Sequence, residues 1–98
     1  MSPKKIKPGS LFLTKTNVNV YTHVNSYGQP RGALLVVKNS LVLLISSAPY
    51  NYAFSELPHK TLRCLASNGT IMYMVTSMIV DTCSFVAALT ANNAGDKI

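Results

Sequence analysis

The residues that could perform acid–base chemistry are scarce in this chain. It has three carboxylate side chains, Glu56, Asp81 and Asp96, and they are far apart in the sequence. Enzymes that use carboxylates commonly need a pair whose environments push their pKa values apart. The supply is too small and too scattered to predict such a pair.

The two histidines and two cysteines are the remaining candidates for nucleophilic or metal chemistry. His23 and His59 fall in predicted loops, whereas Cys64 and Cys83 fall in predicted strands. Their spacing matches no metal site and indicates no nucleophile–base pair. With no secretory signal in view, we expect both thiols to be reduced and packed as small hydrophobic groups. The sequence predicts a protein that is not an enzyme, with no cofactor and no metal.

Aromatic and basic residues are better supplied, and they suit binding. Rings that stack on bases, beside cations that meet phosphates, are typical of surfaces that bind single-stranded nucleic acid. Tyrosine and arginine also dominate protein interfaces, and some rings could simply close the ends of a core. The candidate partner-binding residues are Lys4, Lys5, Lys7, Tyr21, Tyr27, Arg31, Tyr50, Tyr52, Lys60, Arg63 and Tyr73.

Positive charge is concentrated at the N-terminus. The net charge is +6, and three of the nine basic residues lie within residues 1–8. We interpret residues 1–8 as a basic arm that suits a phosphate backbone or an acidic partner, the alternative being a solvated tail. Residues 9–89 are predicted to form one domain and residues 90–98 a disordered tail.

Short β-prone runs separated by turn residues predict five to seven strands. We expect strands at 10–14, 17–21, 33–37, 41–47 and 82–88, and a hairpin over 61–75. Residues 22–32 are a predicted loop or irregular hairpin. Residues 48–60 are a second loop, with a helical turn at 55–57. Residues 76–80 are a predicted bend or 3₁₀ turn. Without helices between the strands, the pairing should be antiparallel, in a sandwich or barrel.

Two stretches are apolar on both faces. Residues 41–47 have apolar side chains at both parities, so we expect a strand covered on both sides. The nearly apolar run 71–89 is long enough to raise the question of a membrane span, but Asp81 lies at its centre. Two strands explain it better, so we expect no membrane contact and a cytoplasmic location.

The hairpin over 61–75 is the strongest local prediction. Asn68-Gly69 lies between two apolar runs, which indicates a two-residue type I′ turn with positive φ at both residues. That turn would pair Leu65 with Met72, Cys64 with Tyr73, and Arg63 with Met74. Both faces of this hairpin are apolar, so the residues alone do not decide which face enters the core.

With the strands in order, the chain resembles bacterial Src-homology-3-like domains over residues 9–86. The resemblance rests on Val18-Asn19-Val20-Tyr21, Gly32-Ala33-Leu34, Lys38-Asn39-Ser40, Leu65, Asn68-Gly69, Tyr73-Met74 and Ser77-Met78-Ile79. It implies a small antiparallel β-barrel with Leu65, Met72 and Met74 inside and Tyr73 on a groove. Cys64 and Ile71 would then be partly exposed unless a strand or another subunit covers them. Such barrels occur in cell-wall-binding, nucleic-acid-binding and phage proteins.

Two functional hypotheses follow. The first is a phage-encoded binding protein that engages nucleic acid or a nucleoprotein complex through the basic arm and the aromatic residues. The second is a protein-interaction or virion-structural module, whose exposed apolar hairpin face meets a host or virion protein or a second copy of the chain. The absence of tryptophan disfavours a cell-wall ligand module.

Overall fold

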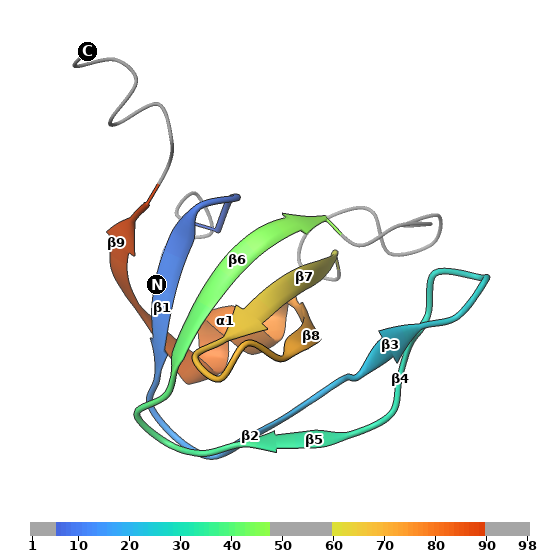
Figure 1. The fold of residues 1–98 in the computed structure, drawn as a ribbon, viewed down its shortest axis with the longest axis horizontal. Coiled ribbons are helices and arrows are strands. Elements are labelled where there is room, and N and C mark those ends of the chain that lie inside the picture. Colours follow the sequence, from blue (N-terminus) through green and yellow to red (C-terminus); the bar gives the residue numbers. More distant parts are fainter. Residues whose placement is uncertain (1–5, 48–59, 90–98) are drawn as a thin grey trace, which may run out of the picture.

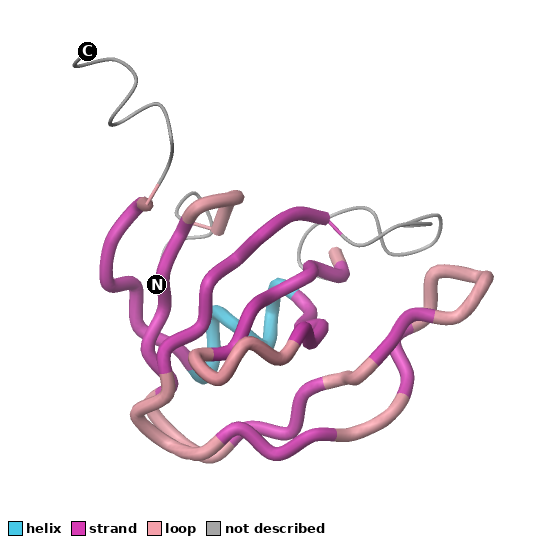
Figure 2. Tube along the Cα trace, in the orientation of Figure 1, coloured by secondary structure: helices cyan, strands magenta, loops and turns pink. Residues whose placement is uncertain are grey.

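The structure is a computed structural model, in which residues 6–47 and 60–89 are described (Figures 1 and 2). The elements of these residues are β1 (Ser10–Thr14), β2 (Val18–Val20), β3 (His23–Val24), β4 (Pro30–Arg31), β5 (Leu34–Val36), β6 (Leu41–Ser47), β7 (Thr61–Ala66), β8 (Ile71–Val75), α1 (Thr76–Thr82) and β9 (Cys83–Ala88). Every strand pair is antiparallel. The predicted all-β class is therefore confirmed. The helical turn expected at 55–57 and the tail from 90 lie outside the described residues.

The strands form one curved sheet and two ribbons. The sheet has the order β8-β7-β6-β1-β9, and the ribbons are β2-β5 and β3-β4. One bridge joins the first ribbon to the sheet, between Tyr21, directly after β2, and Tyr73 of β8. Among the described strands, β5 and β9 each pair with a single neighbour, so the strands do not close into a barrel.

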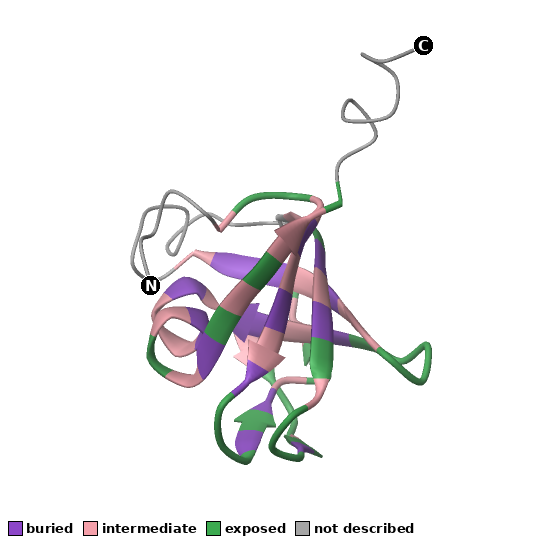
Figure 3. Cartoon of the chain, turned by 90° about the vertical axis from the view of Figure 1, so that its left-hand side faces the viewer, coloured by how far each residue is buried: buried purple, intermediate pink, exposed green. Residues whose placement is uncertain are grey.

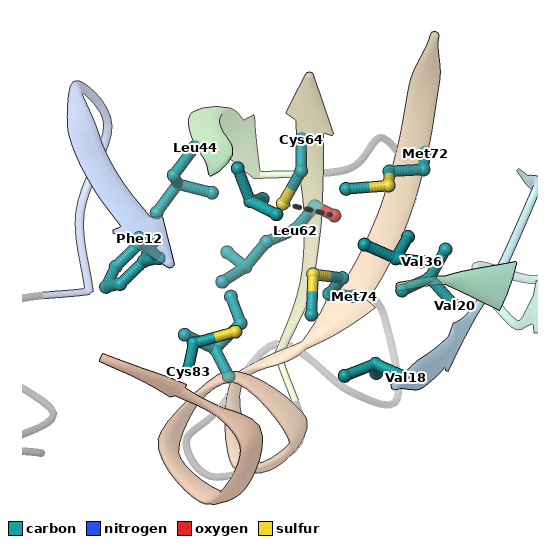
Figure 4. Close-up of a cluster of buried hydrophobic side chains, with 12 residues drawn as sticks. Phe12, Val18, Val20, Val36, Leu44, Leu62, Cys64, Met72, Met74 and Cys83 are labelled. Atoms are coloured by element: carbon teal, nitrogen blue, oxygen red, sulfur yellow. Dashed lines mark hydrogen bonds between the residues drawn. The ribbon is translucent and has the colours of Figure 1, made fainter. Parts of the chain in front are cut away.

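The core lies in the concave side of the sheet (Figures 3 and 4). The ribbon β2-β5 and helix α1 cover it. The sheet contributes Phe12, Val42, Leu44, Leu62, Cys64, Met72, Met74 and Cys83, the ribbon Val18, Val20 and Val36, and α1 Ile79. Both cysteines are free thiols, as predicted, and both are buried.

The turn of the β7–β8 hairpin is longer than predicted by one residue. The Gly69 N–H donates to the Ala66 carbonyl (3.0 Å), and the Ala66 N–H to the Thr70 carbonyl (2.9 Å). Gly69 has a φ of +90°, whereas Asn68 is not among the residues with positive φ. This is a three-residue loop, a type I turn followed by a left-handed glycine. The predicted type I′ turn is wrong.

The longer loop moves the pairing by one residue. Cys64 faces Met72, Arg63 faces Tyr73, and Leu65 faces Ile71. Because side chains alternate along a strand, a slip of one residue exchanges the two faces of one strand relative to the other. Leu65, expected in the core, therefore lies half-buried on the outer face with Arg63, and Cys64 is buried. The expected burial of Met72 and Met74 is confirmed, and Tyr73 lies on the opposite face of β8, half-buried.

Residues after β8 form an α-helix, not the expected bend or 3₁₀ turn. The N–H and hydroxyl groups of Thr76 both donate to the Lys60 carbonyl, at 3.0 and 3.1 Å, which fixes the start of α1. Thr76 and Ile79, one turn apart, are its buried residues. The helix ends where the extended Cys83 begins β9. A full turn is favoured because it buries these two side chains against the sheet. None of the described helices has the length and apolarity that crossing a membrane requires.

The predicted arm is not separate from the domain along its whole length. Ile6 packs against the hydrophobic core, and the Ser10 N–H donates to the Lys7 carbonyl at 3.0 Å. Lys7 itself is exposed. The domain therefore begins near Ile6, three residues before the predicted boundary.

Candidate binding surface

Three of the predicted site residues lie side by side on the outer face of the sheet, the face turned away from the core. Tyr73 is paired with Arg63 of β7 on one side. On the other side it exchanges two backbone hydrogen bonds with Tyr21, of 2.9 and 2.8 Å. Directly opposed residues of antiparallel strands project to the same side. Tyr21, Tyr73 and Arg63 therefore form one row that crosses β7, β8 and the residue directly after β2, here called the Tyr–Arg row, and each is half-buried.

Arg63 carries the charge of this row. Its guanidinium carbon lies 5.9 Å from the centre of the Tyr73 ring, within the range of a cation–π contact. Its Nε is buried without a hydrogen-bond acceptor. Within residues 6–47 and 60–89 the sole carboxylate side chain is Asp81, which is exposed on α1. The cation of Arg63 is thus held against a ring and is not neutralised by a described carboxylate.

The net charge of the described residues also favours an anionic partner. They include six basic side chains and one acidic one, Asp81. A positive surface attracts phosphate-bearing ligands over a distance set by the ionic strength. The Tyr–Arg row could therefore stack planar groups on its two rings while Arg63 meets an anion.

Tyr27 and Arg31 lie on a separate ribbon. The Asn25 side chain closes the β3–β4 loop by accepting the N–H groups of Tyr27 and Gln29, both at 2.9 Å. Tyr27 is 73% exposed at this loop. The Arg31 guanidinium donates to the Gln29 side chain at 2.8 Å. Arg31 pairs with His23, and Tyr27 lies in the loop that joins β3 to β4, whereas the row runs through the Tyr21–Tyr73 bridge, so these two residues are not part of the row. Figure 1 shows this ribbon on the side of the molecule away from β9.

The other predicted residues are distributed as follows. Lys60 is half-buried and precedes β7, where its carbonyl anchors α1 as described above. Lys7 is exposed before β1. Lys4, Lys5, Tyr50 and Tyr52 lie outside the described residues.

An apolar surface next to the Tyr–Arg row carries residues absent from the predicted site. One apolar residue from each strand of the sheet lines up through the strand pairing: Ala87, Leu11, Leu43, Leu65 and Ile71. We call this set the apolar ladder. Leu65 and Ile71 each lie two residues from a member of the row on the same strand, so the two features adjoin. The 41–47 stretch was expected to be covered on both sides, but Leu41 and Ile45 are 42% and 37% exposed, so that prediction is wrong. Its two apolar faces are the sequence signal for this surface.

The reactive side chains do not converge on a site. His23 is exposed, and its Nδ1 lies 3.0 Å from the Thr22 hydroxyl. Burial raises the pKa of the Cys64 thiol to about 12, and the proximity of Cys83 adds to this rise. Burial also raises the pKa of Cys83, against the opposing effects of the Thr82 hydroxyl and Lys15. Neither thiol is therefore ionised near neutral pH. The described His, Cys, Asp and Glu residues form no group of three that could hold a metal ion.

Comparison with known proteins adds no relative: no family model, no curated protein and no solved structure matches this chain.

Proposed function

We propose that this protein is a non-enzymatic binding protein with a Src-homology-3-like fold that engages single-stranded nucleic acid, alone or in a nucleoprotein complex, through the Tyr–Arg row. The observation that carries this proposal is the alignment of the half-buried Tyr21, Tyr73 and Arg63 on the outer face of the sheet. Two adjacent rings can each stack on a base, and Arg63 is available for a phosphate.

The fold part of the proposal is supported by the order of the elements. A bent sheet continues through the Tyr21–Tyr73 bridge into the β2–β5 ribbon, and a helical turn connects the β7–β8 hairpin to the last strand. Small barrels of the Src-homology-3 type combine these features. Fold likeness does not determine a ligand, so the function rests on the row.

A binding isotherm with a fluorescent single-stranded oligonucleotide tests the function. Tyr73→Ala should weaken binding by about 1–3 kcal/mol, the usual contribution of one stacked base. Tyr27→Ala is the matched control, because this ring is exposed on the separate β3–β4 ribbon. Equal affinities for wild type and a folded Tyr73→Ala protein would refute the proposal, as would a wild type that binds no oligonucleotide at low salt.

Salt dependence reports the contribution of the basic residues. For single strands, each phosphate contact contributes about 0.7 to the slope of log affinity against log salt. Replacing Lys4, Lys5 and Lys7 by serine should flatten the slope by about two units while keeping Ile6, which packs on the core. An unchanged slope would remove the arm from the binding surface.

A protein-interaction module is the second candidate, and the apolar ladder favours it. Ile71 is 43% exposed at the end of this ladder, and Leu41 is 42% exposed beside it. Leu11, Leu41, Leu43 and Leu65 line a hollow of about 230 Å³ there. Binding through this face would change little with salt, because apolar burial is not an ionic interaction. Association that is insensitive to salt and lost in Ile71→Lys would favour this candidate over nucleic acid.

A further inference from the structure

The outer edge of β5 presents backbone groups that face away from its partner strand. Tyr21 directs its N–H and C=O toward β8, as its two bonds to Tyr73 show. Backbone N–H and C=O groups alternate in direction from one residue of a strand to the next. The N–H and C=O groups of Val20 and Val18 therefore point toward β5. The backbone groups of their partners Leu34 and Val36 then point toward β2. The N–H and C=O of Leu35, between them, point to the open edge.

A groove adjoins this strand. It has a volume of about 280 Å³ and lies between residues 34–37 on one side and the β7–β8 turn on the other. Leu35 and Val37 are 56% and 58% exposed. In the described part of the chain, β5 pairs with β2 and with no second strand. An exposed edge with apolar side chains is a template for the addition of another strand.

The walls of the groove suit a peptide better than a nucleic acid. The residues that line it are aliphatic on the β5 side and small or polar on the turn side, with Ser67, Asn68 and Thr70 exposed. No ring and no charged side chain is among them. Base stacking requires rings and phosphate binding requires cations, so this groove is distinct from the Tyr–Arg row.

We propose that the β5 edge binds an extended peptide segment of a partner protein by β-strand addition. Backbone hydrogen bonds to Leu35 would hold the peptide, and Leu35 and Val37 would contact apolar side chains at every second peptide position. Lys38 follows Val37 and is exposed, so the peptide should carry an acidic residue at that end. This site is independent of the function proposed for the Tyr–Arg row.

Selection from a displayed library of random ten-residue peptides provides the probe, followed by mapping on ¹⁵N-labelled protein. We expect the enriched peptides to alternate apolar and polar residues and to shift the amide signals of residues 34–37 and 67–70. Leu35→Glu and Val37→Glu should each weaken binding at least tenfold. The matched control is Val86→Glu, at a residue 49% exposed on β9, and it should bind like wild type.

Methylation of peptide nitrogens separates strand addition from side-chain docking. Methyl groups on one alternate set of nitrogens should abolish binding, whereas methyl groups on the other set should be tolerated, because only one set faces β5. Equal tolerance of both sets would overturn the proposal. So would a library with no enriched peptides, enriched peptides that shift residues elsewhere, or displacement of the peptide by an oligonucleotide. If the amide signals of β5 shift with protein concentration in the absence of peptide, the edge binds a second copy of the chain. That result would also overturn the proposal.

Discussion

At the scale of single residues, the two thiols link burial to pH. The pKa of Cys64 is raised in the folded state, because burial disfavours the thiolate, whereas in the unfolded chain it takes its ordinary value near 9. Below that value both states hold the proton and the thiol adds no pH dependence. As the pH rises from 9 toward 12, the unfolded state ionises first and is favoured.

We therefore expect the stability to fall above pH 9 by up to about 1.4 kcal/mol per pH unit for this thiol. Urea melts of wild type and Cys64→Ala between pH 8 and 10 measure the effect. The free energy of unfolding should fall less steeply in the variant than in wild type. Parallel curves would show that Cys64 is not buried as described.

Gly69 is the residue on which the loop of the β7–β8 hairpin depends. Its φ of +90° is unfavourable for residues with a side chain, and an added Cβ would meet no atom within 4 Å. Gly69→Ala should therefore cost about 1–2 kcal/mol through backbone conformation alone. The informative comparison is Asn68→Gly. A type I′ turn would accept a second glycine, because Gly-Gly also suits positive φ at both positions. The observed turn does not require positive φ there, and it would lose the hydrogen bond that the Thr70 N–H donates to the Asn68 side chain at 3.0 Å, so it should lose stability. A stabilised Asn68→Gly protein would contradict the three-residue loop.

At the scale of elements, the strand positions could be predicted because each run is short, β-prone and bounded by turn residues. The register could not. Asn-Gly is compatible with loops of two or three residues, and the loop length decides which side of each strand faces the core. In this hairpin both sides are apolar, so Leu65 and Cys64 gave no signal to choose between them. Helix α1 was missed because its start depends on the distant Lys60 carbonyl.

For the candidate site, too, the residue types could be predicted but their arrangement in space could not. Tyr21, Arg63 and Tyr73 could be selected from the sequence by residue type. Their alignment depends on a bridge between residues 21 and 73, which no local pattern indicates. Tyr27 and Arg31 have the same chemistry but lie on a different ribbon, so residue type alone selects too many candidates.

A pair of neighbouring substitutions in β8 tests the observed faces. Met72 is fully buried, whereas Ile71 is 43% exposed. Met72→Ala should cost about 2–5 kcal/mol of unfolding free energy, because it leaves a cavity in the core. Ile71→Ala should cost much less, because much of this side chain is already in water. Chemical denaturation of both variants gives the two values. A larger loss for Ile71→Ala would reverse the assignment of the faces.

At the scale of the whole molecule, the outer surface combines an aromatic and cationic row with an apolar ladder. The described residues carry excess positive charge, and a single exposed carboxylate lies on α1. Such a surface suits a partner that is both planar and anionic. The same strands contribute to this surface and to the core on the opposite side of the sheet.

The most direct test of the central proposal is to map an oligonucleotide onto the protein, residue by residue. A titration of ¹⁵N-labelled protein with single-stranded DNA should shift the amide signals of Tyr21, Arg63 and Tyr73 first and most strongly, and leave those of residues 34–37 unchanged. Shifts confined to the apolar ladder or to the β3–β4 ribbon, or no shifts at low salt, would contradict the assignment of the Tyr–Arg row as the nucleic-acid-binding surface.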